Sequence, residues 1–260
     1  MKVVILAGGF GTRISEESQS KPKPMVEVGG MPILWHIMKM FSVYGYNEFV
    51  ICAGYKQEYI KQWFSNYYTY LSDVYFDFAT NEKKLLNLPK ENWKVTIVDT
   101  GLNTNTGGRL LRVKDYVGDE RFFLTYGDGV SNVNLNGLLN EHLRNTYKKP
   151  TYVTISSYNY KQHKGVLTLD ENNDVVSFRE KSDVDSQVIN IGYMVCEPQI
   201  FDYIEGDSTP LEDGVLTPLT EQQLVHSYVH NGFWQCMDTL REKQQLEKLW
   251  NEGNAPWKIW

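Results

Sequence analysis

Short apolar runs alternate with helical apolar patterns along the first part of the chain. Val3 to Leu6 is a continuous aliphatic run that ends at glycines, which predicts a buried parallel strand. Residues 32–44 place apolar side chains at helical spacing after a proline, which predicts a helix. The same alternation predicts strands at 48–53, 93–99 and 122–126, and helices at 57–67, 107–116 and 135–146. Strands separated by helices indicate an α/β fold with a doubly wound, mostly parallel sheet.

The pattern changes after Pro150. Short strands with tight turns are predicted at 152–157, 165–169, 175–180 and 190–196, which indicates antiparallel β structure appended to the first sheet. Residues 239–251 are strongly helical, whereas the polar stretch 71–92 predicts an irregular excursion. No linker rich in glycine and serine separates the two parts. We therefore expect a single domain over residues 1–260, with halves at 1–150 and 151–260.

Composition narrows the class of protein. The formal net charge of −6 at pH 7 argues against a nucleic-acid-binding surface, because such proteins usually carry a basic face. Cys52, Cys196 and Cys236 form no CxxC pair, which favours reduced, mostly buried thiols.

The N-terminal apolar run is too short for a signal peptide, and no apolar stretch of about 18 residues follows, so we expect a cytoplasmic protein that does not enter a membrane. His36, on an apolar helix face, is expected to pack and not to bind metal.

The strongest chemical signal directly follows the first strand. The segment LAGGFGTR, residues 6–13, places three glycines within four positions before Arg13. Glycines let the backbone turn tightly and bring N–H groups to phosphate oxygens. The third glycine of a dinucleotide fingerprint and the Lys-Ser/Thr ending of a P-loop are both missing. We interpret the segment as a loop for a triphosphate, with Arg13 in a forked phosphate contact; a plain turn between strand and helix is the alternative.

Three more charged residues complete the candidate chemistry. Lys23 lies between two prolines that hold it in an extended segment, and we expect it to be a second cation for the phosphates. Asp128 follows the strand at 122–126, at the edge where open α/β sheets bind ligands. Asp238 is the plausible partner of Asp128 for Mg²⁺, which uses one or two carboxylates plus phosphates. The alternatives are a solvated linker lysine, an Asx turn at Asp128 and a helix cap at Asp238.

These segments resemble the sugar-1-phosphate nucleotidyltransferase family. The resemblance rests on LAGGFGTR, KPKPM, TYGDGV, the Glu180–Lys181 pair after a strand, and FWQCMDT. Longer segments, such as MVEVGGMPILWHIMKM, TGGRL and APWKIW, resemble members that use CTP and glucose 1-phosphate and make CDP-glucose for deoxysugar and O-antigen biosynthesis. The resemblance implies a Rossmann-like fold, Mg²⁺ as cofactor, CTP and a sugar 1-phosphate as substrates, release of pyrophosphate, and a homo-oligomer, with a hexamer suspected.

The resemblance also implies roles for named residues. Arg13, Lys23 and Asp128 would be catalytic, and Asp128 and Asp238 would hold the metal. In the first half, the nucleotide would be bound by Leu6, Ala7, Gly8, Gly9, Phe10, Gly11, Thr12, Arg13, Lys23, Thr104, Thr106, Gly107, Arg109 and Asp128. In the second half, the sugar phosphate would be bound by Gly165, Glu180, Lys181, Asn190, Gly192 and Trp234.

Several alternatives stay open. Ser182 stands where the family usually has proline, and Gln162-His163-Lys164 precede Gly165 where an aromatic is typical, so a different sugar 1-phosphate is an alternative to glucose 1-phosphate. UTP or dTTP is an alternative to CTP. A non-catalytic nucleotide-sugar-binding homologue would keep the same fold. A dehydrogenase is disfavoured because the dinucleotide fingerprint is broken.

Overall fold

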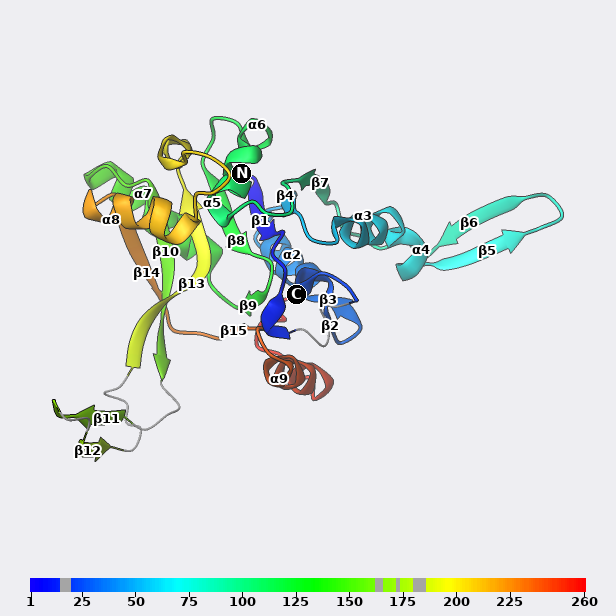
Figure 1. Cartoon of the computed structure of the whole chain (residues 1–260). Coiled ribbons are helices and arrows are strands. Elements are labelled where there is room, and N and C mark those ends of the chain that lie inside the picture. The colour runs from blue at the N-terminus through cyan, green and yellow to red at the C-terminus, as the bar shows by residue number, and fades with distance from the viewer. Residues whose placement is uncertain (15–19, 162–165, 172–173, 180–185) are drawn as a thin grey trace.

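A seven-stranded sheet in the order β14-β10-β13-β8-β1-β4-β7 runs through the protein (Figure 1). The computed structural model describes residues 1–14, 20–161, 166–171, 174–179 and 186–260. The strands of the sheet are β1 (Val3–Ala7), β4 (Glu48–Ala53), β7 (Lys94–Asp99), β8 (Phe122–Tyr126), β10 (Val153–Lys161), β13 (Ser186–Cys196) and β14 (Val225–His230). Strands β8, β1, β4 and β7 pair in parallel. This confirms the predicted α/β class.

The second half of the chain extends this same sheet. Strand β13 pairs antiparallel with both β8 and β10, and β10 pairs in parallel with β14. A separate antiparallel hairpin, β11 (Val166–Leu169) with β12 (Val175–Arg179), lies beyond the far ends of β10 and β13 (Figure 1). The predicted antiparallel structure is therefore present, but most of it continues the first sheet.

Helices cover both faces of the sheet, which explains the continuous apolar run in β1. Val3 and Ile5 lie in a core with Phe41 of α2 (Ile33–Val43). Val4, which points the other way, lies in a second core with Leu110 of α5 (Thr106–Arg112). Successive strand side chains point to opposite faces, so a strand covered on both sides needs apolar residues at every position. The core on the α2 face also receives α3 (Gln57–Ser65), α7 (Leu135–Lys148) and α9 (Leu240–Asn251).

Two predicted elements differ in the structure. The stretch 71–92, predicted to be irregular, contains an antiparallel hairpin, β5 (Asp73–Asp77) with β6 (Glu82–Leu86), so that prediction is wrong. Figure 1 shows this hairpin projecting from the body beyond α4 (Tyr67–Leu71). Its side chains are mostly exposed, so its sequence needs no apolar face. The helix predicted at 107–116 is divided into α5 and α6 (Lys114–Val117).

Short elements connect the main ones. They are β2 (Glu27–Val28), β3 (Met31–Pro32), β9 (Gly129–Ser131), β15 (Trp234–Cys236), α8 (Thr217–Glu221), the 3₁₀ turns η1 (Thr12–Ile14), η2 (Lys23–Met25) and η4 (Pro198–Tyr203), and the π-helix η5 (Glu212–Leu216). Strand β15 pairs antiparallel with β9. That pairing brings the C-terminal part of the chain to the end of β8.

The predicted packing of His36 and the predicted burial of most cysteines are confirmed. His36 is fully buried; its Nε2–H donates to the Val28 carbonyl at 2.8 Å, and its Nδ1 accepts from Trp257 Nε1 at 3.3 Å. The three cysteines are free thiols, with Cys52 and Cys196 buried. In the described part of the chain, no helix has the length and apolar character needed to cross a membrane.

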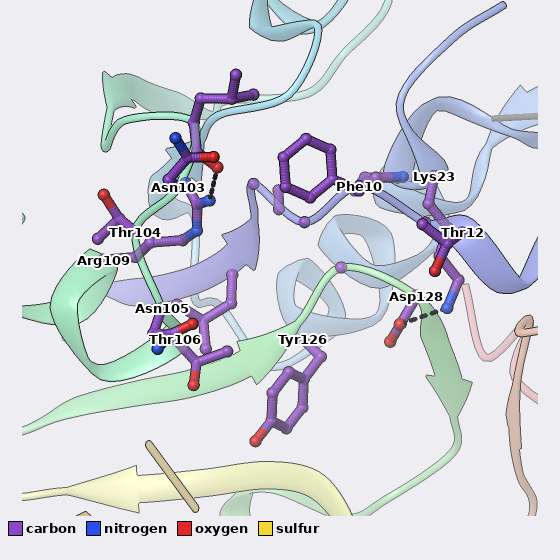
Figure 2. A pocket seen from close by; sticks show the side chains of 18 residues that line it. Phe10, Thr12, Lys23, Asn103, Thr104, Asn105, Thr106, Arg109, Tyr126 and Asp128 are labelled. Carbon is purple, nitrogen blue, oxygen red and sulfur yellow. Dashed lines mark hydrogen bonds and ion pairs between the residues drawn. The ribbon is translucent and has the colours of Figure 1, made fainter. Parts of the chain in front are cut away.

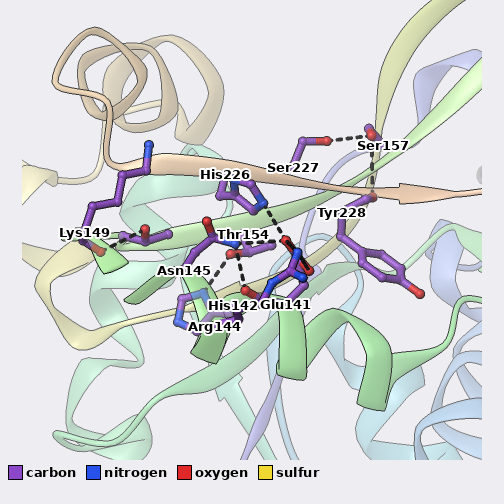
Figure 3. A network of polar contacts seen from close by, with 11 residues as sticks. Glu141, His142, Arg144, Asn145, Lys149, Thr154, Ser157, His226, Ser227 and Tyr228 are labelled. Atoms are coloured by element: carbon purple, nitrogen blue, oxygen red, sulfur yellow. Dashed lines mark hydrogen bonds and ion pairs between the residues drawn. The ribbon is translucent and has the colours of Figure 1, made fainter. Parts of the chain in front are cut away.

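A polar network fastens α7 to the second half of the sheet (Figure 3). The imidazole of His142, fully buried, contacts Thr154 Oγ1 of β10 at 2.8 Å through Nδ1 and Glu197 Oε1 at 3.0 Å through Nε2. The preceding residue, Glu141, contacts His226 Nε2 of β14 at 3.0 Å. Buried polar groups need such partners, so the network fixes how α7 lies on the sheet.

Candidate active site

A cavity of about 460 Å³ opens at the carboxyl ends of β1 and β8 (Figure 2). This is the edge where open α/β sheets bind ligands, and the volume lies within the range of small-molecule sites. The cavity brings together predicted nucleotide-binding residues from four separate segments: Leu6, Ala7, Gly8, Gly9, Phe10, Gly11, Thr12, Lys23, Thr104, Thr106, Arg109 and Asp128.

The glycines of the loop are also needed for the local structure, besides letting phosphates approach the backbone. A Cβ on Gly8 would lie 2.2 Å from Nη1 of Arg109, so a side chain there would collide with the guanidinium. Gly11 has φ +65°, in the left-handed region that glycine tolerates best. The loop therefore combines one sharp turn with one close approach to an arginine.

Arg109 is held firmly at the back of the cavity. Its Nη1 donates to Thr100 Oγ1 at 2.8 Å and to the Gly101 carbonyl at 2.6 Å, and its Nη2 donates to the Leu102 carbonyl at 3.1 Å. Burial lowers the pKa of the guanidinium below its ordinary value. Arg109 therefore has a fixed orientation before a ligand arrives.

Lys23 lies between the two carboxylates predicted to hold a metal. Its Nζ is 2.7 Å from Asp128 Oδ2 and 2.5 Å from Asp238 Oδ1, and the lysine side chain is only 9% exposed. Burial acts to lower the pKa of Lys23, but the attraction of Asp128 and hydrogen bonds to both acids outweigh it, so the pKa is raised. A solvated linker lysine is thereby excluded, and the two acids converge on one cationic atom.

Local structure explains how these distant acids meet. The Met237 N–H donates to the Asp128 carbonyl at 2.9 Å, next to the β9–β15 pairing. Asp238 is not the cap of α9. That role belongs to Thr239, whose Oγ1 accepts from the Glu242 N–H in a capping box. The side chain of Asp238 is thus available to the cation at Lys23 and not to the helix.

A smaller cavity of about 80 Å³ adjoins the first and shares Tyr126 and Asp128 with it. It is lined by three of the residues predicted to bind the sugar phosphate, namely Asn190, Gly192 and Trp234. The indole Nε1 of Trp234 is buried and has no hydrogen-bond partner among the residues that the structure describes. An unpaired buried donor carries a free-energy cost, so it is a natural partner for an oxygen of a ligand.

The remaining predicted residues comprise Gly107, which the structure describes, and four whose side chains or whole residues it does not describe. Gly107 does not line the cavity; a Cβ there would lie 2.7 Å from the Thr209 carbonyl, so it serves a close backbone contact. The backbone of Arg13 belongs to η1, but its side chain lies outside the described residues. The same is true of Gly165, Glu180 and Lys181 as whole residues.

Sequence analysis missed several residues that line the larger cavity: Leu102, Asn103, Asn105, Tyr126 and Gly127. Tyr126 was missed because the chain has 17 tyrosines, so the residue type alone does not indicate a site. Its place at the end of β8, two residues before Asp128, was the signal that could have found it.

Comparison with known proteins shows the family and the fold that this chain shares. A family model described as nucleotidyl transferase matches residues 2–239. Glucose-1-phosphate cytidylyltransferase of Salmonella typhi is 47% identical over 261 residues and covers 100% of both chains. A probable glucose-1-phosphate cytidylyltransferase of Bacillus subtilis (strain 168) is 42% identical, with the same coverage. The crystal structure of HddC from Yersinia pseudotuberculosis complexed with GMP-PN has a TM-score of 0.66 at 21% identity, covering 96% of this chain and 99% of that one, which shows the shared fold.

Proposed function

The chain belongs to the nucleotidyl transferase family, and we propose that it transfers a cytidylyl group from CTP to α-D-glucose 1-phosphate, giving CDP-glucose and pyrophosphate. The observation that carries this proposal is the contact of Lys23 with Asp128 and Asp238 beside a nucleotide-sized cavity, which Lys23 and Asp128 line. The full-length similarity to relatives named as glucose-1-phosphate cytidylyltransferases supports the choice of both substrates.

The proposed reaction needs positioning and charge neutralisation from the protein. A phosphate oxygen of glucose 1-phosphate attacks the α-phosphorus of CTP in line, a new phosphorus–oxygen bond forms, and the bond to the bridging oxygen breaks so that pyrophosphate leaves. No protein nucleophile is required. The loop at residues 8–12 offers backbone N–H groups to the triphosphate, while Lys23 and Arg13 offset the repulsion between two phosphorylated substrates.

The acids fit a divalent cation. Asp128 and Asp238 approach one ammonium nitrogen within 2.7 and 2.5 Å, so the same two oxygens can face a common ion. We propose that they hold Mg²⁺, which when bound would neutralise phosphate charge as a Lewis acid. Lys23, released from the acids, would then be free to contact phosphate oxygens.

We propose the smaller cavity as the sugar subsite. It adjoins Asp128, and the unpaired Trp234 Nε1–H can donate to a sugar hydroxyl. Asn190 and Gly192 line the same cavity. We also propose Gly165, Glu180 and Lys181 as sugar-phosphate ligands, on the family resemblance alone. A different sugar 1-phosphate would have to fit this same small space.

Further proposals concern the setting of the enzyme. We propose a cytoplasmic homo-oligomer, with a hexamer suspected, whose product feeds deoxysugar and O-antigen biosynthesis. Exposed aromatic side chains on the β5–β6 hairpin, such as Phe78, offer apolar surface for a second copy of the chain. Light scattering of the purified protein tests the oligomer; a monomer at every concentration would rule it out.

The decisive experiment is a substrate matrix. The protein with Mg²⁺ is given CTP, UTP, dTTP or GTP against glucose, galactose or mannose 1-phosphate, and pyrophosphate release is measured. The expected result is the highest kcat/KM with CTP and glucose 1-phosphate, and loss of that activity in Asp128→Asn. A higher kcat/KM for another pair would correct the substrates, and no release with any pair would favour the non-catalytic homologue.

A further inference from the structure

The carboxylate of Glu212, which was not among the predicted site residues, accepts hydrogen bonds from two residues that line the site. Tyr126 lines both cavities, and its hydroxyl donates to Glu212 Oε1 at 2.5 Å. Thr106, which lines the larger cavity, donates through Oγ1 to Glu212 Oε2 at 3.1 Å. Figure 2 shows the side chains of Thr106 and Tyr126 in the same cavity. Both oxygens of Glu212 are therefore engaged with side chains of the candidate site, although Glu212 does not line it.

Backbone contacts position Glu212 in the ligand-free protein. Glu212 opens the π-helix η5, a rare turn that is frequent at functional sites. The segment just before it lies against α5, where the Asn105 N–H donates to the Asp207 carbonyl at 2.8 Å and the Gly108 N–H to the Thr209 carbonyl at 3.1 Å. A Cβ on Gly108 would lie 2.5 Å from the Asp207 carbonyl oxygen, so only glycine permits this approach.

The position of the Tyr126 ring affects the smaller cavity more than the larger one. A Cβ on Gly192 would lie 2.5 Å from Cδ2 of Tyr126, so the ring lies directly on the backbone of β13. Gly192 has φ +80°, which also favours glycine. Gly192 and Tyr126 both line a space of about 80 Å³, against about 460 Å³ for the nucleotide cavity. A given movement of the Tyr126 ring would therefore change the volume of the smaller cavity by a much larger fraction than the volume of the larger cavity.

We infer that Glu212 is a positioning residue that holds Tyr126 against Gly192 and thereby sets which sugar 1-phosphate the smaller cavity accepts. This inference rests on the proposed function, because it assigns the sugar to the smaller cavity. Glu212 contacts no reacting atom and acts through the tyrosine hydroxyl. A hydrogen bond to a charged group is stronger than a neutral one, so its removal frees the ring.

The test compares three variants of the full-length enzyme by steady-state kinetics. Glu212→Ala is expected to raise the KM for glucose 1-phosphate about tenfold, to change the KM for CTP and kcat by less than about threefold, and to lower the preference for glucose over galactose 1-phosphate. Tyr126→Phe should show the same pattern. The double variant should be no worse than either single variant, because the two residues act as one unit. Glu212→Gln, which keeps an acceptor oxygen, should recover part of the preference.

A matched control comes from the next residue. Asp213, also exposed on the same turn, should tolerate replacement by alanine without change in the sugar preference. The inference is overturned if Glu212→Ala leaves the sugar KM and preference unchanged, if it alters CTP binding as strongly as sugar binding, or if the effects of Glu212→Ala and Tyr126→Phe simply add. Failure of the wild-type protein to release pyrophosphate would instead overturn the proposed function.

Discussion

At the scale of single residues, Lys23 offsets the charge of two neighbouring carboxylates in the ligand-free protein. Asp128 and Asp238 would repel without a cation between them, and Lys23 supplies that cation internally. A divalent ion that binds to the acids has to replace this ammonium. The lysine thus offsets the charge of the two acids in the ligand-free protein, and it is in contact with both of them before substrates bind.

Lys23→Met should therefore have two opposite effects. Turnover is expected to fall on the order of a hundredfold or more, because a charge-stabilising group is lost. Binding of Mn²⁺ to the nucleotide-free protein, followed by electron paramagnetic resonance, should tighten, because the acid pair has lost its internal cation. Asp128→Asn is the comparison and should weaken Mn²⁺ binding. If Lys23→Met bound Mn²⁺ no better than the wild-type protein, competition between lysine and metal would be excluded.

Gly8 gives a second prediction at this scale. In Gly8→Ala the new Cβ would meet the Arg109 guanidinium at 2.2 Å, and the arginine has to leave its carbonyl partners. Because the colliding atom is at the end of a flexible side chain, the fold should survive. The KM for CTP is expected to rise about tenfold through loss of an oriented charged donor.

Thermal unfolding and CTP kinetics measured together check this expectation. Gly206→Ala is the control, since nothing lies within 4 Å of a Cβ at that position. A Gly8→Ala protein that binds CTP as the wild type does would show that Arg109 has no part in nucleotide binding.

At the scale of elements, α2 and the C-terminal segment are fastened together around His36. The His36 ring lies 4.7 Å from the Trp250 ring and 6.0 Å from the Trp260 ring, between centroids. Burial is the main cause that lowers the pKa of His36 to about 4, from an ordinary value of 6.5. The imidazole is therefore neutral in the folded protein at neutral pH.

This packing predicts a pH dependence of stability. The unfolded chain takes up a proton at this histidine near pH 6.5 and the folded chain only near pH 4. Between these values the unfolded state binds more protons, so stability is lost as the pH falls, by about 3 kcal/mol at most from this group. Urea unfolding from pH 7 to 4.5 should show the loss. His36→Gln, which keeps a donor and an acceptor, should flatten the slope, and an equal slope in both proteins would contradict the assignment.

Local sequence patterns predicted elements well where periodicity and burial agree. The strands at 48–53 and 122–126 have the predicted bounds, because an apolar run buried on both faces leaves little choice of ends. The hairpin at 73–86 was missed because its side chains are mostly exposed, so composition carries no signal of a buried face. Strand β14 was missed as well; its half-buried pattern lacks the apolar run used to find the others.

At the scale of the whole molecule, the sequence predicted most of the segments that line the larger cavity, but not the contacts among their side chains. The glycine loop, Lys23 and the two acids lie where the sheet edge requires them. The Lys23 contact with both acids joins segments 105 and 215 positions apart, and the Glu212 bridge joins segments 86 positions apart at Tyr126 and 106 at Thr106. Such contacts follow from tertiary packing, which local propensity does not encode.

The long separation between Lys23 and Asp238 has a consequence for synthesis on the ribosome. Chains are made from the N-terminus, so the glycine loop and its lysine appear first, whereas the second acid follows 215 positions after the lysine. Met237 and the strand before it must then dock beside Asp128. A growing chain that has not reached Asp238 can already hold the glycine loop, Lys23 and Asp128, but it lacks one of the two acids that contact the lysine.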